Sequence, residues 1–383
     1  MNIAFDAKRA YHNNTGLGQY SRTLIRLLAS AFPQHEYFLY NPRKSAAYQL
    51  EGRNMHEMRP KGIPSSLFPS AWRSNWVKSD LKKHKINLYH GLSHEIPLGI
   101  ENTGIPSIVT IHDLIHEKFP EQYTAIDVKI YSKKFRNACD NATRIIAISR
   151  QTKQDIMEIY KIPSSKIDIC YQSCFQEFGQ NFSEQTKDEV RSKFGLPKKF
   201  FLSVGSIIER KNLLNVCKAM FLLRQVVDIP LVVIGDGGKY KQKVQDFIRQ
   251  HDLDNRVIFL SEKFPVTDTL RWSNIELPVI YQLATAMIYP SYYEGFGLPV
   301  LEALQSSLPV ITSNVSCLPE AGGDAAYYVN PNSAEEIAEG MRLIYTDPEL
   351  VDIMVDKGYR YASEFSLDRY GSRVMDIYKQ VWK

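Results

Sequence analysis

The sequence has few cysteines and no long apolar run. Its five cysteines are scattered singly, without a Cys-x-x-Cys pair, so neither a disulfide framework nor a zinc site is expected. No uncharged apolar stretch approaches the roughly 20 residues that cross a bilayer. The N-terminus enters an apolar segment at once, without the basic and apolar regions of an export signal. We therefore expect a compact protein of the reducing cytoplasm.

A strong net charge is also absent, but the positive charge is unevenly distributed. The net charge is +5, and residues 1–190 hold 25 lysines and arginines against 19 aspartates and glutamates. Two clusters in this half are either solvated helix faces or a surface for anionic lipid or a pyrophosphate-linked acceptor. Because stacking aromatics are not interleaved, no nucleic acid partner is expected. The clusters are Lys78, Lys82, Lys83 and Lys85, and Lys129, Lys133, Lys134 and Arg136.

The length of 383 residues exceeds what one core usually organises, so two domains are expected. Short β-branched runs alternate with helical stretches in both halves, which is typical of parallel sheets with crossover helices. The sequence thus predicts an α/β protein of two Rossmann-like, doubly wound domains, residues 1–175 and 197–366. Residues 176–196 are the expected linker, and the helix 367–383 is expected to return to the first domain. The predicted strands are 2–5, 37–40, 88–90, 107–111 and 144–148, then 200–204, 231–234, 257–260, 286–289 and 309–312.

A glycine-rich loop in the second half has the pattern of an anion site between two carboxylates. Gly295 and Gly297 can adopt positive φ, and Pro299 favours the first turn of a helix. Free N–H groups at a helix start bind phosphate. Glu302, expected in that first turn, could bind the two hydroxyls of a ribose, and Glu294 those of a second sugar. Alternatively, both glutamates only complement the helix dipole.

Two cations follow the first predicted strand of the second domain. That strand ends at Gly205, and Arg210 and Lys211 come shortly after it. Ligands of open α/β sheets bind beyond the carboxyl ends of the strands, so the two cations are expected where a diphosphate would lie. They could neutralise the charge of a departing nucleotide. Asn212 is expected to cap the next helix, and an ordinary exposed Arg-Lys pair is the alternative.

Candidates in the first domain are weaker. Gly16 and Gly18 could shape a phosphate or sugar loop before a helix, but the third glycine of a dinucleotide fingerprint is missing, so a tight turn is the alternative. His112 ends a predicted strand and could donate to a sugar hydroxyl or pyrophosphate, with Asp113 orienting it. A structural His-Asp pair is the alternative. His90 ends another strand and could line an acceptor site.

In this order, the motifs resemble those of the GT-B retaining glycosyltransferases of family 4. The resemblance covers nearly the whole chain and implies two Rossmann-like domains that face each other across a cleft, with the donor bound by the second. It rests on the Glu294-x7-Glu302 spacing, the 205–212 segment, Ser316-Cys-Leu-Pro-Glu320, Phe365-Ser366 and the first-domain motifs.

The resemblance implies roles at the matching positions. In catalysis, His112 would lie near the reacting carbon, Glu294 on the donor sugar, and Arg210 and Lys211 on the diphosphate. No metal and no cofactor are implied, because cationic residues and a helix start would supply the positive charge. The implied donor-binding residues are Gly16, Gly18, Gly205, Gly295, Phe296, Gly297, Leu298 and Glu302.

Within this family, the sequence resembles bacterial mannosyltransferases of polysaccharide assembly. This resemblance implies retaining transfer of a hexosyl group, foremost mannose from GDP-mannose, onto a growing glycan or lipid-linked oligosaccharide. The implied partners are the nucleotide-sugar donor and the glycan or lipid-linked acceptor. The protein is expected in the cytoplasm, in peripheral contact with the inner face of the membrane. A nucleotide-sugar epimerase, a nicotinamide-dependent dehydrogenase and a non-catalytic sugar-binding protein remain alternatives. Residues 265–273 resemble an insertion near the base pocket, which leaves the base open.

Overall fold

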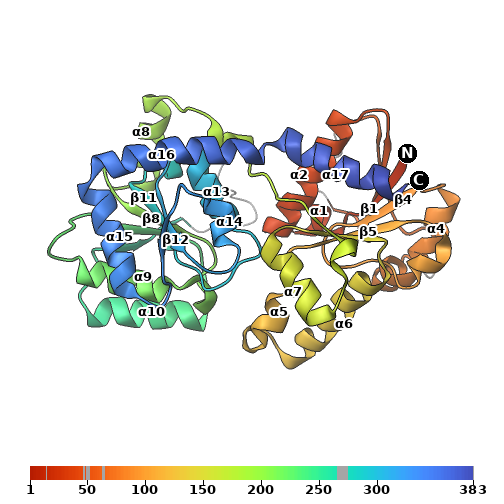
Figure 1. Cartoon of the computed structure of the whole chain (residues 1–383), viewed down its shortest axis with the longest axis horizontal. Coiled ribbons are helices and arrows are strands. Elements are labelled where there is room, and N and C mark those ends of the chain that lie inside the picture. The colour runs from red at the N-terminus through yellow and green to blue at the C-terminus, as the bar shows by residue number, and fades with distance from the viewer. Residues whose placement is uncertain (14, 46–47, 49–51, 63–64, 265–274, 383) are drawn as a thin grey trace. The chain divides into compact units, whose positions relative to one another are not determined.

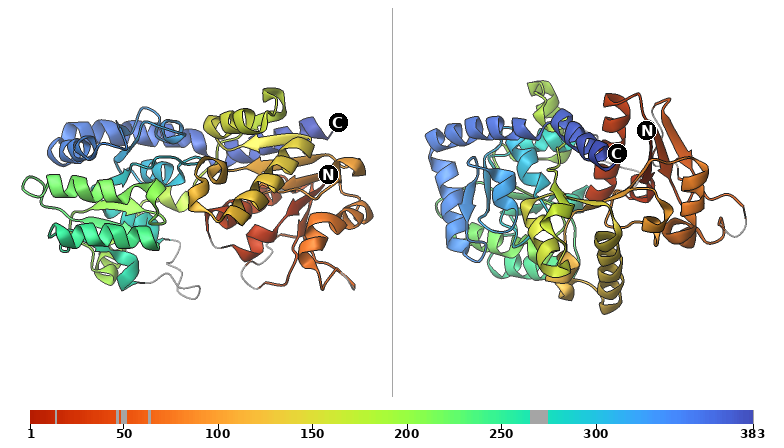
Figure 2. Two further views of the ribbon diagram at one scale, coloured as in Figure 1. Left: turned by 90° about the horizontal axis from the view of Figure 1, so that it is seen from below. Right: turned by 45° about the vertical axis from the view of Figure 1, so that its right-hand side comes forward.

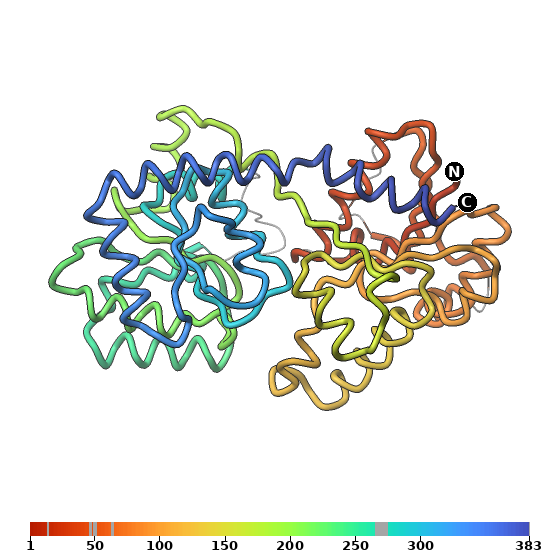
Figure 3. The backbone as a smooth tube through the Cα atoms, in the orientation of Figure 1, coloured from red at the N-terminus to blue at the C-terminus, as the bar shows by residue number. Residues whose placement is uncertain are grey.

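The computed structural model describes residues 1–13, 15–45, 48, 52–62, 65–264 and 275–382. The chain divides into unit 1, Met1–Gln172 with Leu367–Lys383, and unit 2, Ser173–Ser366. Each unit contains a parallel sheet with helices packed on it (Figures 1 and 2). Figure 3 traces the chain through unit 1 and unit 2 and back into unit 1 for its last helix.

In the described part of unit 1, seven parallel strands have the order β3-β2-β1-β4-β5-β6-β7. The order reverses between β1 and β4, as in a Rossmann fold, and such a reversal marks the edge where ligands bind. The inner strands β4 and β5 are buried at every position, because helices cover both faces. The strands are β1 (Asn2–Asp6), β2 (Glu36–Tyr40), β3 (Met55–Met58), β4 (Leu88–Gly91), β5 (Ser107–Ile111), β6 (Arg144–Ala147) and β7 (Ile167–Ile169).

The last helix of the chain completes the core of unit 1. It packs beside α2, and its buried face includes Val374, Met375 and Ile377 (Figure 1). The helices of this unit are α1 (Lys8–His12), α2 (Gly16–Ala31), α3 (Pro69–Ala71), α4 (Val77–Lys83), α5 (Ile115–Lys118), α6 (Ala125–Asn141), α7 (Arg150–Tyr160) and α17 (Leu367–Val381), with the short helices η1 (Trp72–Trp76), η2 (Ile100–Thr103), η3 (Pro120–Gln122) and η4 (Ser164–Lys166).

Unit 2 repeats the same topology. Its described residues form six parallel strands in the order β10-β9-β8-β11-β12-β13, again with a reversal, here between β8 and β11. The strands are β8 (Phe201–Val204), β9 (Leu231–Ile234), β10 (Val257–Phe259), β11 (Ala286–Tyr289), β12 (Val310–Ser313) and β13 (Tyr327–Val329). The helices are α8 (Glu184–Phe194), α9 (Leu213–Leu222), α10 (Lys239–Gln250), α11 (Leu260–Lys263), α12 (Glu276–Leu283), α13 (Leu298–Gln305), α14 (Leu318–Gly322), α15 (Ala334–Thr346) and α16 (Pro348–Ala362), with η5 (Gln176–Gly179), η6 (Glu209–Lys211) and η7 (Ser363–Phe365).

The stretch predicted as a linker is folded against unit 2. Residues 176–196 include α8, which packs on α12: Lys193 pairs with Glu276, and the Phe194 ring lies 5.0 Å from that of Phe264. The insertion expected at residues 265–273 lies outside the described residues. Across the described ranges, every helix is too short or too polar to cross a bilayer.

Candidate functional site

Three charged side chains of unit 2 meet beyond the carboxyl ends of β8 and β11. Arg210 and Lys211 belong to η6, which follows β8, and Glu294 lies in the loop that follows β11. A terminal guanidinium nitrogen of Arg210 lies 2.8 Å from Glu294 Oε2, and Lys211 Nζ lies 3.7 Å from Glu294 Oε1. The structure therefore brings together the two segments that the sequence predicted at one edge of the sheet.

Hydrogen bonds hold the Glu294 carboxylate in place. The hydroxyls of Tyr289 and Ser291 donate to Glu294 Oε1 over 2.8 and 3.0 Å. Burial raises the pKa of Glu294, but Lys211, Arg210 and the hydrogen bonds outweigh burial, so this pKa lies below its ordinary value. Glu294 is thus an anion fixed between two cations.

Two residues shape the η6 turn. Gly205 has a φ of 129°, and a Cβ at this position would lie 2.6 Å from Lys211 Nζ, so only glycine leaves room for the ammonium group. Asn212 has a φ of 63°, and its amide donates to the carbonyls of Pro290 and Pro331 over 3.0 and 2.6 Å. Asn212 is the N-cap residue of α9, as predicted, but its side chain makes no capping hydrogen bond, and its amide ties η6 to neighbouring loops instead.

The glycine-rich loop leads into α13, which begins at Leu298 with Gly297 as its N-cap. Gly297 has a φ of 108°, and a Cβ there would lie 3.0 Å from Leu318 Cδ2. Of the two glycines that can adopt positive φ, only Gly297 does so, and it makes the turn into the helix. The free N–H groups at this helix start are of the kind that binds phosphate.

Two predicted donor residues lie deeper than expected. Phe296 is 3% exposed, and its ring lies 5.8 Å from that of Phe365, so it packs in the interior of unit 2. Glu302 lies in the second turn of α13, not the first, because the helix already begins at Leu298. Glu302 Oε2 accepts a hydrogen bond from the Tyr281 hydroxyl at 2.9 Å. Burial raises the pKa of Glu302 to about 7, so the carboxyl is about half ionised at neutral pH.

In unit 1, His112 is a neutral side chain with both ring nitrogens bound. Its Nε2 lies 3.0 Å from the Leu92 carbonyl oxygen, and its Nδ1 lies 3.1 Å from Gln172 Nε2. Because a carbonyl oxygen only accepts, Nε2 carries the proton and Nδ1 accepts from the amide. The Tyr20 ring packs edge-on at 4.4 Å. Burial lowers the pKa of His112 to about 4, which keeps the ring uncharged at neutral pH.

Two other candidates in unit 1 serve local structure. Asp113 Oδ1 accepts a hydrogen bond from the Ile115 N–H over 3.0 Å, while other groups bind the neighbouring histidine ring. His90 is fully buried between Thr110 Oγ1, at 2.8 Å, and the Tyr378 hydroxyl, at 2.6 Å. The prediction that His90 could line an acceptor site is wrong, since burial leaves it no surface for a ligand.

Gly16 and Gly18 lie in the first turn of α2 and not in a loop that follows β1 directly. The short helix α1 lies between β1 and these glycines. A Cβ at Gly18 would lie 1.8 Å from the Asn13 carbonyl oxygen, whereas a Cβ at Gly16 would meet nothing within 4 Å. Gly18 is therefore required by a close backbone approach, and Gly16 leaves the start of α2 open.

Two family models match the chain. The model described as Glycosyltransferase Family 4 matches residues 14–172, and the model described as Glycosyl transferases group 1 matches residues 184–361. Between them, they cover most of both units. The chain belongs to the family 4 glycosyltransferases.

This glycosyltransferase is 25% identical to O-antigen chain mannosyltransferase B of Escherichia coli over 396 aligned residues, with 99% of this chain and 100% of the relative covered. Its fold matches a glycosyltransferase from Rickettsia africae with a TM-score of 0.75 and 17% identity, covering 100% and 98% of the two chains. It also matches HepE of Anabaena in complex with UDP-glucose, with a TM-score of 0.74 and 15% identity over 99% and 100%. These likenesses show that it has the GT-B fold of two Rossmann-like domains.

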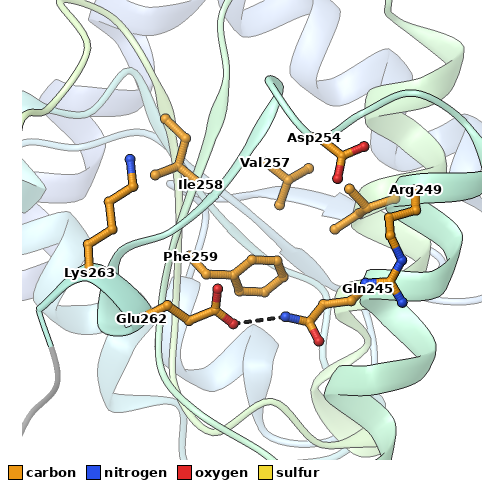
Figure 4. Close-up of a pocket in the computed structure, with 9 residues that line it drawn as sticks. Gln245, Arg249, Asp254, Val257, Ile258, Phe259, Glu262 and Lys263 are labelled. Atoms are coloured by element: carbon orange, nitrogen blue, oxygen red, sulfur yellow. Dashed lines mark hydrogen bonds between the residues drawn. The ribbon is translucent and has the colours of Figure 1, made fainter.

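A pocket of about 260 Å³ lies at β10, away from the predicted site residues of the glycosyltransferase, none of which lines it. Figure 4 shows its polar lining, in which Gln245 Nε2 donates to Glu262 Oε1 over 2.8 Å. Within the described ranges, no group of three or more His, Cys, Asp or Glu side chains could hold a metal ion. The pocket residues are Gln245, Ile248, Arg249, Asp254, Val257, Ile258, Phe259, Glu262 and Lys263.

Sequence reasoning missed the polar side chains that hold the predicted site residues of the glycosyltransferase. Tyr289 and Ser291 hold Glu294, Tyr281 holds Glu302, and Gln172 holds His112. Tyr289 had a usable signal, since it is the last residue of a predicted strand, at the edge where ligands bind. Gln172 had none.

Proposed function

We propose that this glycosyltransferase transfers a mannosyl group from GDP-mannose, with retention of configuration, onto a growing glycan or lipid-linked oligosaccharide of a surface polysaccharide. The cluster of Arg210, Lys211 and Glu294 at the sheet edge, followed by the start of α13, carries the proposal. Similarity over the full length to an O-antigen chain mannosyltransferase supports the choice of sugar and of acceptor class.

In this proposal, Arg210 and Lys211 bind the diphosphate and stabilise the negative charge that develops on the leaving nucleotide. Glu294 orients both cations before the donor arrives, so that little reorganisation is needed at the moment of transfer. Glu294 can also accept a hydrogen bond from a sugar hydroxyl, and Glu302 can accept from the ribose. Because these cations and the start of α13 supply the positive charge, the proposal includes neither a metal ion nor a cofactor.

His112 acts in the proposal as a hydrogen-bonding group for the donor sugar: when the donor binds, the Nε2–H of His112 exchanges the Leu92 carbonyl for an oxygen of the sugar. Its neutral ring, with the proton on Nε2, is not suited to general acid catalysis at neutral pH. The enzyme is placed in the cytoplasm, with a peripheral contact at the inner face of the membrane, where a lipid-linked acceptor would lie.

A donor screen tests the proposal. Purified enzyme is given GDP-mannose, UDP-glucose or ADP-glucose with a mannose-terminated oligosaccharide, and the products are analysed by mass spectrometry and NMR. We expect transfer from GDP-mannose with an α-linkage, and equal rates with and without EDTA. The Anabaena fold neighbour in complex with UDP-glucose makes UDP-glucose the informative competitor. Transfer from UDP-glucose alone would overturn the mannose assignment, and a β-linked product would overturn retention.

The same assay separates transfer from epimerisation. Without an acceptor, an epimerase of this fold would still convert the sugar of the donor, whereas a transferase needs the acceptor for turnover beyond slow hydrolysis. An epimerised nucleotide sugar formed in the acceptor-free reaction would therefore overturn the proposed transfer.

A further inference from the structure

Helix α6 of unit 1 turns apolar side chains toward solvent. Ile126 is 72% exposed, Ile130 is 44% exposed, and Tyr123, just before the helix, is 38% exposed. Ile126 and Ile130 are four residues apart, so they lie on the same face of the helix. Exposed apolar residues that cluster in this way mark an interaction surface, whereas single ones need no explanation.

The same exposed region of α6 is strongly basic. Lys129, Lys133, Lys134 and Arg136 are all exposed. Lys129 lies between the two isoleucines in the sequence, and the other three cations follow in the next turns of the helix. Apolar side chains flanked by lysines are typical of helices that lie in the interface of an anionic membrane.

A second exposed apolar group lies around η1. Its members are Leu67, Phe68, Trp76 and Leu98, which are 67%, 58%, 38% and 51% exposed. Leu98 is held against this segment, because its N–H donates to the Ser74 carbonyl over 2.8 Å and its carbonyl accepts from Lys78 Nζ over 2.6 Å. This group therefore also pairs apolar side chains with a lysine.

One carboxylate joins the two groups. Glu95 Oε2 lies 2.9 Å from a guanidinium nitrogen of Arg73 in η1 and 3.2 Å from Lys134 Nζ in α6. Arg73 also pairs with Asp6, the last residue of β1. Both exposed groups consequently lie near the carboxyl edge of the sheet of unit 1, the edge at which α/β proteins bind their ligands. Figure 1 shows α6 at the rim of this unit.

We propose that this basic apolar surface of unit 1, formed by α6 with Tyr123 and by η1 with its neighbours, docks on an anionic phospholipid bilayer. The apolar side chains enter the interface, and the lysines contact the phosphate headgroups. Docking holds the carboxyl edge of the sheet against the bilayer, where a lipid-linked acceptor presents its glycan. The inference rests on the proposed function only for the identity of that acceptor.

Co-sedimentation of the full chain with vesicles tests this surface without donor or acceptor. We expect binding to phosphatidylglycerol–phosphatidylethanolamine vesicles and little binding to phosphatidylcholine vesicles. The double variant Ile126→Ser/Ile130→Ser should weaken binding by about tenfold or more, because it removes the inserted side chains. The double variant Lys129→Gln/Lys133→Gln should weaken binding about fivefold per lysine and reduce its salt dependence.

Matched controls lie on unit 2. Ile353→Ser, at a site that is 49% exposed, and Lys243→Gln, at a site that is 60% exposed, should bind vesicles like the wild type. Circular dichroism checks the folding of every variant. An equal loss of vesicle binding in the control variants would overturn the proposed docking surface. A wild-type protein that does not bind anionic vesicles would overturn it as well.

Transfer to a short water-soluble acceptor separates docking from the sugar chemistry. The Ile126→Ser/Ile130→Ser variant should retain wild-type transfer to this acceptor and lose it only with a vesicle-bound acceptor. Loss with both acceptors would overturn the docking role. Vesicle binding with no turnover of GDP-mannose would instead leave the surface standing and overturn the proposed donor.

Discussion

At the scale of single residues, removal of the Lys211 side chain should lower activity strongly while disturbing the fold little. Its side chain is 18% exposed, and its ammonium group contacts both Glu294 and the Tyr289 hydroxyl. Removing one preorganised donor commonly costs about 3 kcal/mol of barrier, so Lys211→Ala should lower kcat about 100-fold at saturating donor. Steady-state kinetics measure this, with Lys243→Ala as the control. Full turnover of Lys211→Ala would contradict a role for Lys211 at the leaving group.

Glu302 should make both donor binding and stability depend on pH. Its pKa of about 7 in the folded chain lies above the ordinary value near 4.5, so the folded state binds the proton more tightly than the unfolded state. Stability therefore falls as pH rises from about 4.5 to about 7, and stays lower above that. Glu302→Gln should raise the free energy of unfolding by about 3 kcal/mol at pH 8 and change it little at pH 4. Urea denaturation at the two pH values measures this.

The exposed Glu189→Gln on α8 is the matched control for this experiment and should show no such difference. Donor affinity should move in the opposite direction to stability, because only the ionised carboxylate accepts strongly from a ribose. For the wild type, calorimetric titration should give tighter donor binding at pH 8 than at pH 6, and the Gln variant should lose this dependence. A Gln variant that titrates like the wild type would rule out Glu302 as the source.

At the scale of elements, the return of α17 to unit 1 depends on one buried hydrogen bond as well as on apolar packing. The Tyr378 hydroxyl bonds to His90 on β4, and His90 bonds onward to Thr110 and, through it, to Tyr20. Tyr378→Phe keeps the ring but leaves a buried histidine nitrogen without its partner, which should cost about 1–3 kcal/mol of stability. Thermal unfolding measures the loss. The exposed Tyr359→Phe, on α16, is the control, and equal effects would contradict the prediction.

The strands that the sequence did not predict are all sheet edges. The ten predicted strands are present with ends shifted by at most one residue, but β3, β7 and β13 were missed. An edge strand has one neighbour and is only partly covered by helices, so it needs no continuous apolar run. β3, for example, reads Met-His-Glu-Met, and three of its four residues are only half buried. Apolar patterning therefore finds the inner strands of a doubly wound sheet more readily than its borders.

The sequence predicted those site residues that directly follow a predicted strand. Gly205 and Glu294 follow neighbouring strands, so their meeting at one edge follows from topology alone. The hydrogen-bond partners of Glu302 and His112 could not be predicted from topology. Tyr281 and Gln172 reach them through side-chain packing between segments that are distant in the sequence. The neutral state of His112 likewise depends on its burial, which the sequence did not reveal.

At the scale of the whole molecule, the two units should respond differently to acid, because the buried histidines lie in one of them. His251 is the one histidine of unit 2, and the other eight lie in unit 1. Burial lowers the pKa of His90 to about 3 and that of His112 to about 4, and lowers the pKa of His94 well below its ordinary value. Unit 1 thus contains several groups that must stay neutral for the fold to persist.

Between the lowered pKa values of these histidines and about pH 6.5, the unfolded state of unit 1 binds more protons than the folded state. The stability of unit 1 should therefore fall as pH drops through this range. At pH 5, the expected loss is about 2 kcal/mol for each of His90 and His112. In unit 2, Glu302 has the opposite effect, since its raised pKa favours the folded state as pH falls. Hydrogen exchange at pH 7.5 and pH 5, corrected for the intrinsic exchange rates, should therefore show β4 and β5 losing protection while β8 and β11 keep theirs. Equal loss in both sheets, or earlier loss in unit 2, would contradict the assignment of acid sensitivity to the buried histidines.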